Sequence, residues 1–472
     1  MIQLNGTKFI NYYDYLINNC KQYSQMQDFY HSRCNFHDNT INDFLICAGK
    51  NFVMEDFING TFYLYPRAID SVVRNNDYSN NKNYSFRITA YASLGRKGMP
   101  RVYNNKGIQT CITGTNCDAG WLTGKNTLSK RFLSKRNDLV TCSDQSVLLK
   151  CNIDSSNDII NNGYSSIFGG EMIQCKLTNI NGYNYESSAS NCYFKDVTRS
   201  YHRGHYFYNC YADNIVCGTS ANATDETVIK YDNCILHNCQ FGDGYWSTGK
   251  TIEIKNCIII NDSDLPIFNK TEYSTKYPIT FENCYIECSN TSKEAAFYYY
   301  DNRSYNDDPT LDNYYVHGAM ITFKNCTIKL NDNYLLRFDT HDSLGANIMN
   351  LTFTNNRIIG THADEYFPAK TTHTNELNVH DSSNRDTDFE LESYDIHVCK
   401  KSMEVGEENW LLIKPVPMNA TNNNYTIEIS NDNIEFADDN VLFKCLKQGE
   451  TTITVTSIDN PEIKVSKTIK ID

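Results

Sequence analysis

The sequence predicts an all-β protein built mainly from a right-handed parallel β-helix, and three observations support this. Eight cysteines recur through the middle of the chain, each followed two places later by an apolar residue. An asparagine directly precedes most of these cysteines, and further apolar residues lie three places before them and, in the later copies, five places before them. A polar stretch then separates the repeat from a C-terminal segment whose pattern predicts a small β-sandwich.

The repeat emerges when the chain is aligned on cysteine. We call each aligned residue an anchor, and in the ninth copy the anchor is Asn356. The eight others are Cys151, Cys175, Cys192, Cys210, Cys234, Cys257, Cys284 and Cys326. Every residue two places after an anchor is apolar, from Ile153 to Ile358, whereas the first and third places are mixed. This alternation is typical of a strand with one buried face, so the anchors should face inward.

A second strand precedes each anchor and ends at a single bent residue. Its apolar residues lie five and three places before the anchor, as Ile252 and Ile254 do before Cys257. Because three is odd, both strands can face inward only if one residue between them leaves the alternation. Asparagine occupies that place at Asn191, Asn209, Asn233, Asn256, Asn283, Asn325 and Asn355. Among residues other than glycine, asparagine tolerates a left-handed backbone best.

Two strands, an asparagine bend and a loop of variable length together predict one coil of a parallel β-helix. Stacked coils would align the asparagine amides in a ladder and the thiols in a buried row. A free cysteine behaves as a small apolar residue inside a core. We therefore expect these cysteines to be reduced, without a role in disulfides or metal binding.

Composition excludes several classes of partner. The chain has 43 Lys+Arg against 56 Asp+Glu, a net charge of −13, and no basic block. Nucleic acid and anionic membrane are therefore not expected to bind. No apolar run is long enough for a transmembrane helix, and the first residues do not resemble a secretory signal. The sequence indicates no cofactor and no metal site.

The predicted domain organisation has four parts. Residues 1–30 form an N-terminal cap, in which the apolar spacing of Lys8–Gln25 predicts a short amphipathic helix. Residues 31–370 form the parallel β-helix with its Asn and Cys ladders. Residues 371–392 are a polar linker, and residues 393–472 form the C-terminal module.

Two segments resemble known families. Phe86–Tyr91 followed by Gly98–Tyr103 is similar to the early coil of pectate-lyase-like β-helix proteins. The C-terminal module resembles the bacterial immunoglobulin-like group 2 family. The matching segments are Met403–Glu407, Leu411–Ala420, Ile429–Asn431 and Lys447–Val455, although Ile427 or Ile429 replaces the family's usual tryptophan. The resemblance implies an Ig-like sandwich, of a kind that occurs on bacterial surface proteins and on the outside of tailed-phage particles.

A catalytic constellation is hard to assemble from the outward positions. Inverting polysaccharide hydrolases need two carboxylates about 6.5–9.5 Å apart, and the motifs of polygalacturonase-type enzymes are not reproduced here. Asp213 and His237, three places after consecutive anchors, are the one acid–base neighbour pair and the candidate catalytic residues. The pattern favours a non-enzymatic protein, with a polysaccharide lyase or glycoside hydrolase as the alternative.

Loops after the Cys234, Cys257 and Cys284 strands carry aromatic and acidic residues that suit a glycan. Aromatic faces stack on sugar rings at little cost in side-chain entropy, and neighbouring acids accept hydrogen bonds from hydroxyls. The candidate glycan-binding residues are Asp243, Tyr245, Trp246, Asp262, Asp264, Tyr298, Tyr299, Tyr300, Asp301 and Arg303.

The resemblances and the reduced cysteines together predict a virion-surface protein of a tailed bacteriophage. It would be a fibre, spike or decoration protein, made in the bacterial host cytoplasm, that binds a host-surface glycan or receptor and other virion proteins. The alternatives are a tailspike-like polysaccharide depolymerase and a bacterial surface adhesin.

A homotrimer is expected, because solenoids of this kind in phage particles are often trimers. In addition, outward residues one place after the anchors form an apolar stripe suited to being covered by a loop or by another subunit. This stripe consists of Tyr193, Tyr211, Ile235, Ile258 and Tyr285.

Overall fold

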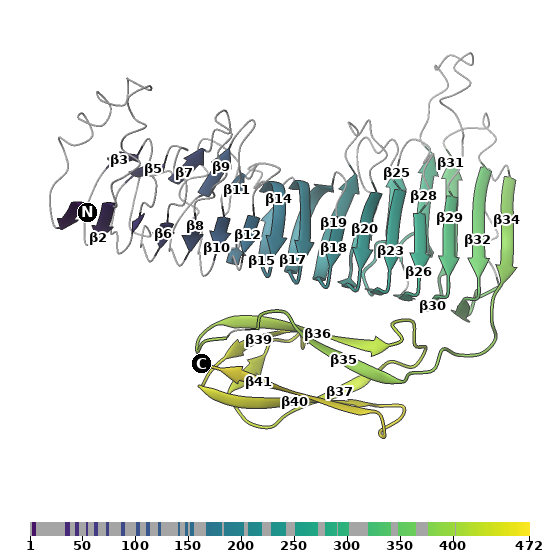
Figure 1. Cartoon of the computed structure of the whole chain (residues 1–472). Helices are drawn as coiled ribbons and strands as arrows, with labels where there is room; N and C mark the ends of the chain where they lie inside the picture. The colour runs from purple at the N-terminus through teal and green to yellow at the C-terminus, as the bar shows by residue number, and fades with distance from the viewer. Residues whose placement is uncertain are drawn as a thin grey trace, which may run out of the picture. The chain divides into compact units, whose positions relative to one another are not determined.

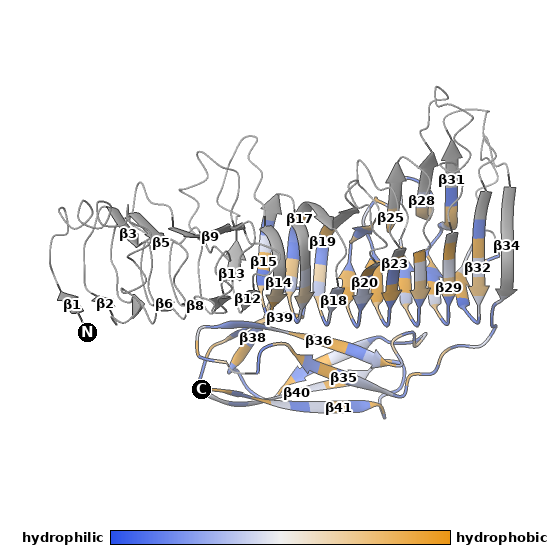
Figure 2. Cartoon of the chain, turned by 45° about the horizontal axis from the view of Figure 1, so that its top comes forward, coloured by the Kyte–Doolittle hydropathy of each residue, from blue (hydrophilic) through white to orange (hydrophobic). Residues whose placement is uncertain are grey.

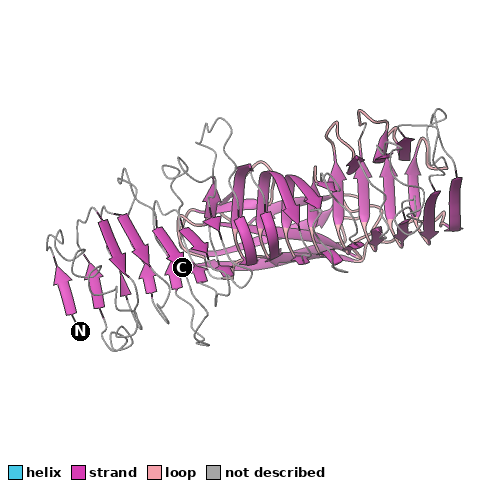
Figure 3. Cartoon of the chain, turned by 90° about the horizontal axis from the view of Figure 1, so that it is seen from above, coloured by secondary structure: helices cyan, strands magenta, loops and turns pink. Residues whose placement is uncertain are grey.

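A computed structural model describes part of the 472-residue chain. Within residues 1–166 it describes only the strands, and within residues 167–472 it describes most of the residues. Within residues 167–472, the structure does not describe 182–183, 203–205, 220–227, 242–250, 272–278, 290, 302–319, 341–347, 365–375 and 402. The described residues form strands and no helix (Figure 3). The helix predicted over Lys8–Gln25 lies outside them. The chain divides into two compact units, residues 1–200 and 201–472.

In the first unit, the strands stack in parallel rows. One row contains β1 (Ile2–Asn5), β2 (Cys34–His37), β4 (Val53–Met54), β6 (Val72–Arg74), β8 (Arg101–Tyr103), β10 (Trp121–Thr123) and β12 (Val147–Leu149). A second contains β3 (Asp43–Ile46), β5 (Thr61–Leu64), β7 (Phe86–Thr89), β9 (Thr110–Thr113) and β11 (Val140–Thr141). Both rows pair with β14 (Ile167–Ile173), which pairs with β16 (Asn184–Ser190). A third contains β13 (Asn152–Asp154), β15 (Lys176–Asn181) and β17 (Tyr193–His202). The chain alternates between rows, as it does in a parallel β-helix.

The second unit, described by itself, has the same architecture with longer and more regular rows, whose strands lie side by side in Figure 1. The strands before the bends are β18 (Tyr206–Tyr208), β20 (Val228–Asp232), β23 (Thr251–Lys255), β26 (Ile279–Glu282), β29 (Met320–Lys324), β32 (Ile348–Thr354) and β34 (Glu376–Ser383). Those after the bends are β19 (Tyr211–Thr219), β21 (Ile235–His237), β24 (Ile258–Asn261), β27 (Tyr285–Cys288), β30 (Thr327–Leu330) and β33 (Arg357–Gly360). A third row contains β22 (Gln240–Phe241), β25 (Phe268–Thr271), β28 (Ala295–Asp301) and β31 (Tyr334–Thr340). All these pairs are parallel.

The predicted asparagine bends are confirmed. All seven asparagines before the anchors have positive φ, between 50° and 57°, and Gln174 adopts the same conformation at 53°. The bend allows the residue three places before the anchor and the anchor itself to face the same interior, as the buried pair Ile254 and Cys257 shows. Figure 2 shows the resulting mixture of hydrophobic and hydrophilic residues along the strands.

The interior consists of rows of similar side chains from successive coils. Phe281 stacks on Phe323 with ring centroids 5.1 Å apart, and Phe323 stacks on Phe353 at 5.5 Å. The described anchor cysteines are 0–1 % exposed, and the eleven cysteines that the structure describes are free and buried. Burial raises the pKa of the Cys257 thiol, because the surrounding core cannot solvate a thiolate.

Asn356 replaces cysteine at the ninth anchor without leaving its buried amide unpaired. Its side chain is 0 % exposed. The carbonyl oxygen accepts from the backbone N–H of Cys326 at 2.9 Å. The amide nitrogen donates to the carbonyl of Phe323 at 2.9 Å and to Asn384 Oδ1 at 3.2 Å. These bonds offset the cost of burying a polar group.

Outside the core, bend asparagines form a hydrogen-bonded chain that we call the Asn ladder. Asn355 donates to Asn325 at 2.9 Å, Asn325 to Asn283 at 3.3 Å, and Asn283 to Asn256 at 3.3 Å. Asn256 in turn donates to Asp232 Oδ1 at 2.9 Å. Each coil is thus tied to the next at the same corner.

The C-terminal module consists of two antiparallel sheets around one core. One sheet has the order β35 (Ser393–Val398), β36 (Glu408–Val416), β39 (Leu442–Cys445) and β38 (Ile434–Phe436). The other has the order β37 (Tyr425–Ile429), β40 (Gly449–Ser457) and β41 (Lys464–Ile471). Leu411, Ile413, Phe443, Ile453 and Val455 are fully or nearly fully buried between them. Membership of the immunoglobulin-like group 2 family stays a prediction.

The predicted linker contains regular structure. Glu376–Ser383 forms β34, which pairs in parallel with β32 and adds another strand to the stack. A polar composition suggested an irregular segment here, but backbone hydrogen bonding to an existing strand does not require apolar side chains. The irregular connection between β34 and β35 is therefore short.

Within the second unit, the module contacts the β-helix directly. Lys414 Nζ donates to Asn209 Oδ1 at 3.0 Å, and Asn419 Nδ2 donates to the carbonyl of Asn325 at 2.6 Å. The hydroxyl of Thr327, one place after the Cys326 anchor, donates to the carbonyl of Asn419 at 2.6 Å. Lys414 and Asn419 are buried, so the module is docked on the coils.

This docking explains the apolar stripe. Tyr211, Ile258 and Tyr285 are only 4–7 % exposed, and they are aligned in one register that continues to Thr327. At one end of this row, burial raises the pKa of the Tyr211 hydroxyl, and Asp439 and Tyr425 of the module act in the same direction. At the other end, Thr327 contacts the module. The module therefore lies at both ends of this part of the stripe, while Ile235 within it is half-buried.

We expect Asn355→Gly to be less destabilising than Asn355→Ala, by about 0.5–1 kcal/mol. Both variants lose the ladder amide. In alanine the left-handed backbone also costs about 1–2 kcal/mol of folding free energy. This cost exceeds the about 0.5–1 kcal/mol that glycine loses because its unfolded chain has more conformational freedom. Urea denaturation of the full chain measures the difference, and equal stabilities would contradict a strained bend.

The anchor thiols should react with iodoacetamide only after denaturation, since the Cys257 side chain is 0 % exposed and its pKa is raised. Mass spectrometry of the labelled peptides tests this. Cys257→Asp should cost more than about 4 kcal/mol because a buried carboxylate would lack a partner, whereas Cys257→Ala should cost about 1 kcal/mol. Rapid native labelling of Cys257 would refute a buried thiol row.

Candidate functional site

The candidate site lies at a second corner of the coil, where the strands after the asparagine bends end. His237 is the last residue of β21, and Asn238 follows with a φ of 50°. Asn179, Asp196 and Asn214 have the same left-handed conformation in preceding coils. This bend turns the chain toward the third strand row and leaves the side chain of His237 on the outer surface, half-buried.

The structure brings the two candidate catalytic residues together and adds a third group. His237 Nδ1 lies 2.8 Å from Asp213 Oδ1 on the preceding coil. Its Nε2 lies 3.3 Å from Asp262 Oδ2 on the following coil. Asp262 was predicted as a glycan-binding residue, so the structure joins residues from the two predicted sets into one cluster, the His237 corner (Asp213, His237, Asn238, Asp262 and Ser263).

Asn238 holds the Asp262 side of the corner in place. Its amide nitrogen donates to Asp262 Oδ1 at 2.6 Å. Its carbonyl oxygen accepts from the backbone N–H groups of Asp262 at 2.9 Å and Ser263 at 3.1 Å. The left-handed corner residue therefore orients a carboxylate that remains accessible, because the Asp262 side chain is 60 % exposed.

The hydrogen bonds favour the charged forms of both partners. The hydrogen bond to Asp213 raises the pKa of His237, against the opposing effect of desolvation. The hydrogen bond from Asn238 lowers the pKa of Asp262, and the nearby imidazole acts in the same direction. The corner is thus an imidazolium between two carboxylates when His237 is protonated.

This geometry suits recognition better than hydrolysis. The two carboxylates contact opposite nitrogens of one imidazole, so the ring occupies the space in which a hydrolase would hold a glycosidic oxygen and a water. Asp262, by contrast, can present an exposed carboxylate to ligand hydroxyls, whereas the Ser263 hydroxyl already donates to Asn261 Oδ1 at 2.7 Å. The arrangement fits hydrogen bonding to a polyhydroxylated ligand.

Other predicted glycan residues have different positions. Asp264 is exposed next to the corner. Tyr298 is only 6 % exposed, and Lys293 Nζ lies 4.5 Å from its ring centroid. Its ring is therefore poorly exposed for stacking on a sugar, although strand alternation turns the neighbouring Phe297, and not Tyr298, toward the aromatic core.

The remaining candidates fall where the structure describes little or nothing. Tyr299, Tyr300 and Asp301 belong to β28, which pairs with β31, but their side chains lie outside the description. Asp243, Tyr245, Trp246 and Arg303 lie outside the described residues.

Asn238 and Ser263 were missed from the sequence. A signal for Asn238 existed, because asparagine or aspartate recurs four places after the anchors at Asn179, Asp196, Asn214 and Asn238. It marks a second left-handed corner of the coil. Ser263 follows from no pattern, since its position depends on how the loop after β24 folds against Asn238.

Two searches for other kinds of site gave no candidate in the described part of the chain. No group of three or more His, Cys, Asp or Glu residues there could hold a metal ion. Nor is any helix there long and apolar enough to cross a membrane.

Comparisons with known proteins add little. No protein-family model matches the chain, and no curated protein matches it. Among solved structures, the tailspike receptor-binding domain of siphovirus 9NA aligns over 93 % of this chain and 85 % of that chain, with 9 % identity and a TM-score of 0.18. A likeness this weak carries no argument about fold or function.

The stabilising contribution of His237 should depend on pH. Its pKa is raised in the folded chain, so its contribution is fully present below the unfolded-state value of about 6.5 and is lost as pH rises through the folded value. The stability difference between the wild type and His237→Gln should therefore be larger at pH 5.5 than at pH 8.5 in urea denaturation. A difference that is constant or grows with pH would contradict the Asp213 contact.

Proposed function

We propose that this chain is an exterior structural protein of a tailed-phage particle, a fibre, spike or decoration protein, and that it attaches the particle to a glycan on the host surface. The observation that carries the attachment function is the His237 corner. There, Asp262 is exposed and held by Asn238. A rigid, prearranged set of polar groups reduces the entropy cost of binding a hydroxyl-rich ligand.

The location of the corner supports this function. It lies where the strands after the bends end, and its residues Asp213, His237 and Asp262 come from consecutive coils. A glycan that runs along the stack could therefore contact more than one coil. Stacked coils also provide a stiff scaffold, and sites on rigid strands hold their geometry better than sites on loops alone.

The cysteines support synthesis in a reducing compartment. The eleven described thiols are buried and unbridged, although disulfides form readily in proteins that fold in oxidising environments. Phage particle proteins fold in the bacterial cytoplasm and leave it by lysis, which fits a chain of reduced cysteines that functions outside the cell. A secreted adhesin fits this feature less well.

Attachment is tested with the labelled full chain on an array of bacterial capsular and cell-wall polysaccharides. We expect saturable binding to at least one polysaccharide, weakened about threefold to tenfold by Asp262→Asn, which removes a charge-assisted hydrogen bond. Asp432→Asn is the matched control, because Asp432 is an exposed, ion-paired carboxylate on the C-terminal module, and it should bind like the wild type. Immunogold labelling should place the chain on the outside of particles.

Two outcomes would contradict the proposal. If Asp262→Asn and Asp432→Asn changed the affinity for the polysaccharide equally, the His237 corner would not be part of the binding site. Steady release of oligosaccharide from the bound polysaccharide, abolished by Asp213→Asn or His237→Ala, would instead establish a depolymerase.

A further inference from the structure

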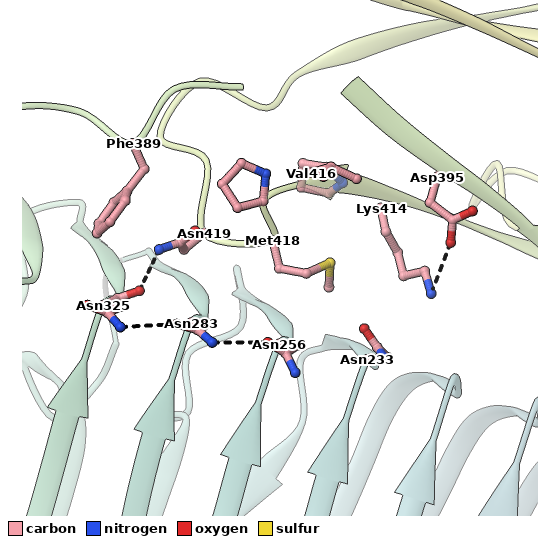
Figure 4. A pocket seen from close by; sticks show the side chains of 12 residues that line it. Asn233, Asn256, Asn283, Asn325, Phe389, Asp395, Lys414, Val416, Met418 and Asn419 are labelled. Carbon is pink, nitrogen blue, oxygen red and sulfur yellow. Dashed lines mark hydrogen bonds and ion pairs between the residues drawn. The ribbon is translucent and has the colours of Figure 1, made fainter. Parts of the chain in front are cut away.

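A groove of about 550 Å³ lies in the second unit between the bend asparagines and the C-terminal module. Figure 4 shows the asparagine side chains along its floor and Met418 pointing toward them from the opposite wall. The floor is formed by Asn233, Asn256, Asn283 and Asn325, and the opposite wall by Phe389, Pro415, Val416, Pro417 and Met418. Lys414 and Asp395 lie at one end, and Asn419 at the other (Figure 4).

The floor has unused hydrogen-bonding capacity. A carboxamide has two N–H donors and an oxygen with two lone pairs. In the Asn ladder, Asn283 uses one donor and one lone pair, toward Asn256 and Asn325. Asn233 is outside the ladder, because Asn256 donates to Asp232 instead. Among the described residues, the half-buried side chain of Asn233 has no hydrogen-bond partner, so its amide is free for a ligand.

An extended peptide does not fit this floor. The backbone N–H groups of Asn233, Asn256 and Asn283 already donate to carbonyls of the next coil, at 3.2, 2.9 and 3.0 Å. No strand edge is therefore open for β-augmentation. Amides on adjacent coils repeat about every 4.8 Å, which matches neither the ~3.3 Å rise of a peptide nor its two-residue period.

The charge of the lining favours a neutral ligand. Lys414 and Asp395 are the charged residues among those that line the groove, and they pair with each other at 3.3 Å. Lys414 also donates to Asn209, and its side chain is only 8 % exposed. A buried, paired cation offers little attraction to an anionic ligand.

We propose that this groove binds a short neutral oligosaccharide. Hydroxyl groups, which both donate and accept, would bond the amides of Asn233 and Asn283, and the apolar faces of the sugar rings would pack on Val416 and Met418. The floor spans three coil spacings, about 14 Å, and the volume is in the usual range for small-ligand sites.

The groove is separate from the His237 corner, and the proposal does not rest on the virion assignment. Asn233 and Asn238 lie at opposite ends of β21 (Ile235–His237), so one ligand at the groove floor does not contact the corner. The walls come from a β-helix and a β-sandwich, which makes the docked module part of a binding site.

Isothermal titration of the full chain with cellotriose, maltotriose and triacetylchitotriose tests the proposal. At least one of these sugars should bind saturably. Asn233→Gly should weaken its Kd about threefold to tenfold, since one amide is lost while glycine keeps the left-handed backbone and no ladder bond is broken. Met418→Trp should abolish binding by filling the groove. Asn440→Gly is the matched control, because Asn440 also has a left-handed backbone, with a φ of 54°, and lies outside the groove lining; it should leave Kd unchanged.

Several results would overturn the groove. These are no saturable binding of any of the three sugars at millimolar concentration, equal weakening by Asn233→Gly and Asn440→Gly, or unchanged affinity in Met418→Trp. Tighter binding of trigalacturonic acid than of every neutral trisaccharide would refute the neutral ligand class. Asp262→Asn should not affect trisaccharide affinity, and a loss there would assign the binding to the His237 corner instead.

Discussion

One left-handed residue before each described anchor, an asparagine in seven coils and Gln174 in another, is the constraint on which the rest of this structure depends. Strand side chains alternate between two faces, so a continuous strand could not bury both the residue three places before the anchor and the anchor itself. A residue at φ near 50° removes one step from the alternation, and asparagine can adopt that conformation at low cost. Both strands then turn an apolar face to one interior, and successive coils stack with equivalent residues in register.

Register creates rows, and each row has its own chemistry. Inside, aromatic rings stack at about their favoured separation, and the anchor thiols form a buried row, in which burial raises the pKa of Cys257. At the end of the cysteine row, Asn356 replaces cysteine, and its amide is hydrogen-bonded to the backbone of Cys326 and Phe323 on the preceding coil. Outside, the bend residues themselves form a polar ladder. The feature that permits folding therefore also forms a line of amides on the surface.

Both proposed sites use the two left-handed corners of the coil. The His237 corner lies at the C-terminal ends of the strands after the bends, where hydrogen bonds hold charged and amide groups at the surface. The groove lies at the N-terminal ends of the same strands, and the C-terminal module forms its second wall. The module also lies at both ends of the stripe from Tyr211 to Thr327. The homotrimer stays a prediction.

The sequence by itself determined the repeat, the inward anchors, the buried free thiols and the asparagine bends, because each follows from local spacing and backbone preference. It also placed Asp213 beside His237, since equivalent residues of adjacent coils must be neighbours. Tertiary structure decided the contact of His237 with Asp262, the burial of Tyr298, the pairing of β34 and the docking of the module. The bond between Lys414 and Asn209 joins residues 205 positions apart. Such a contact leaves no periodic signal, because it depends on the shapes of two separately folded surfaces and not on the pattern within either.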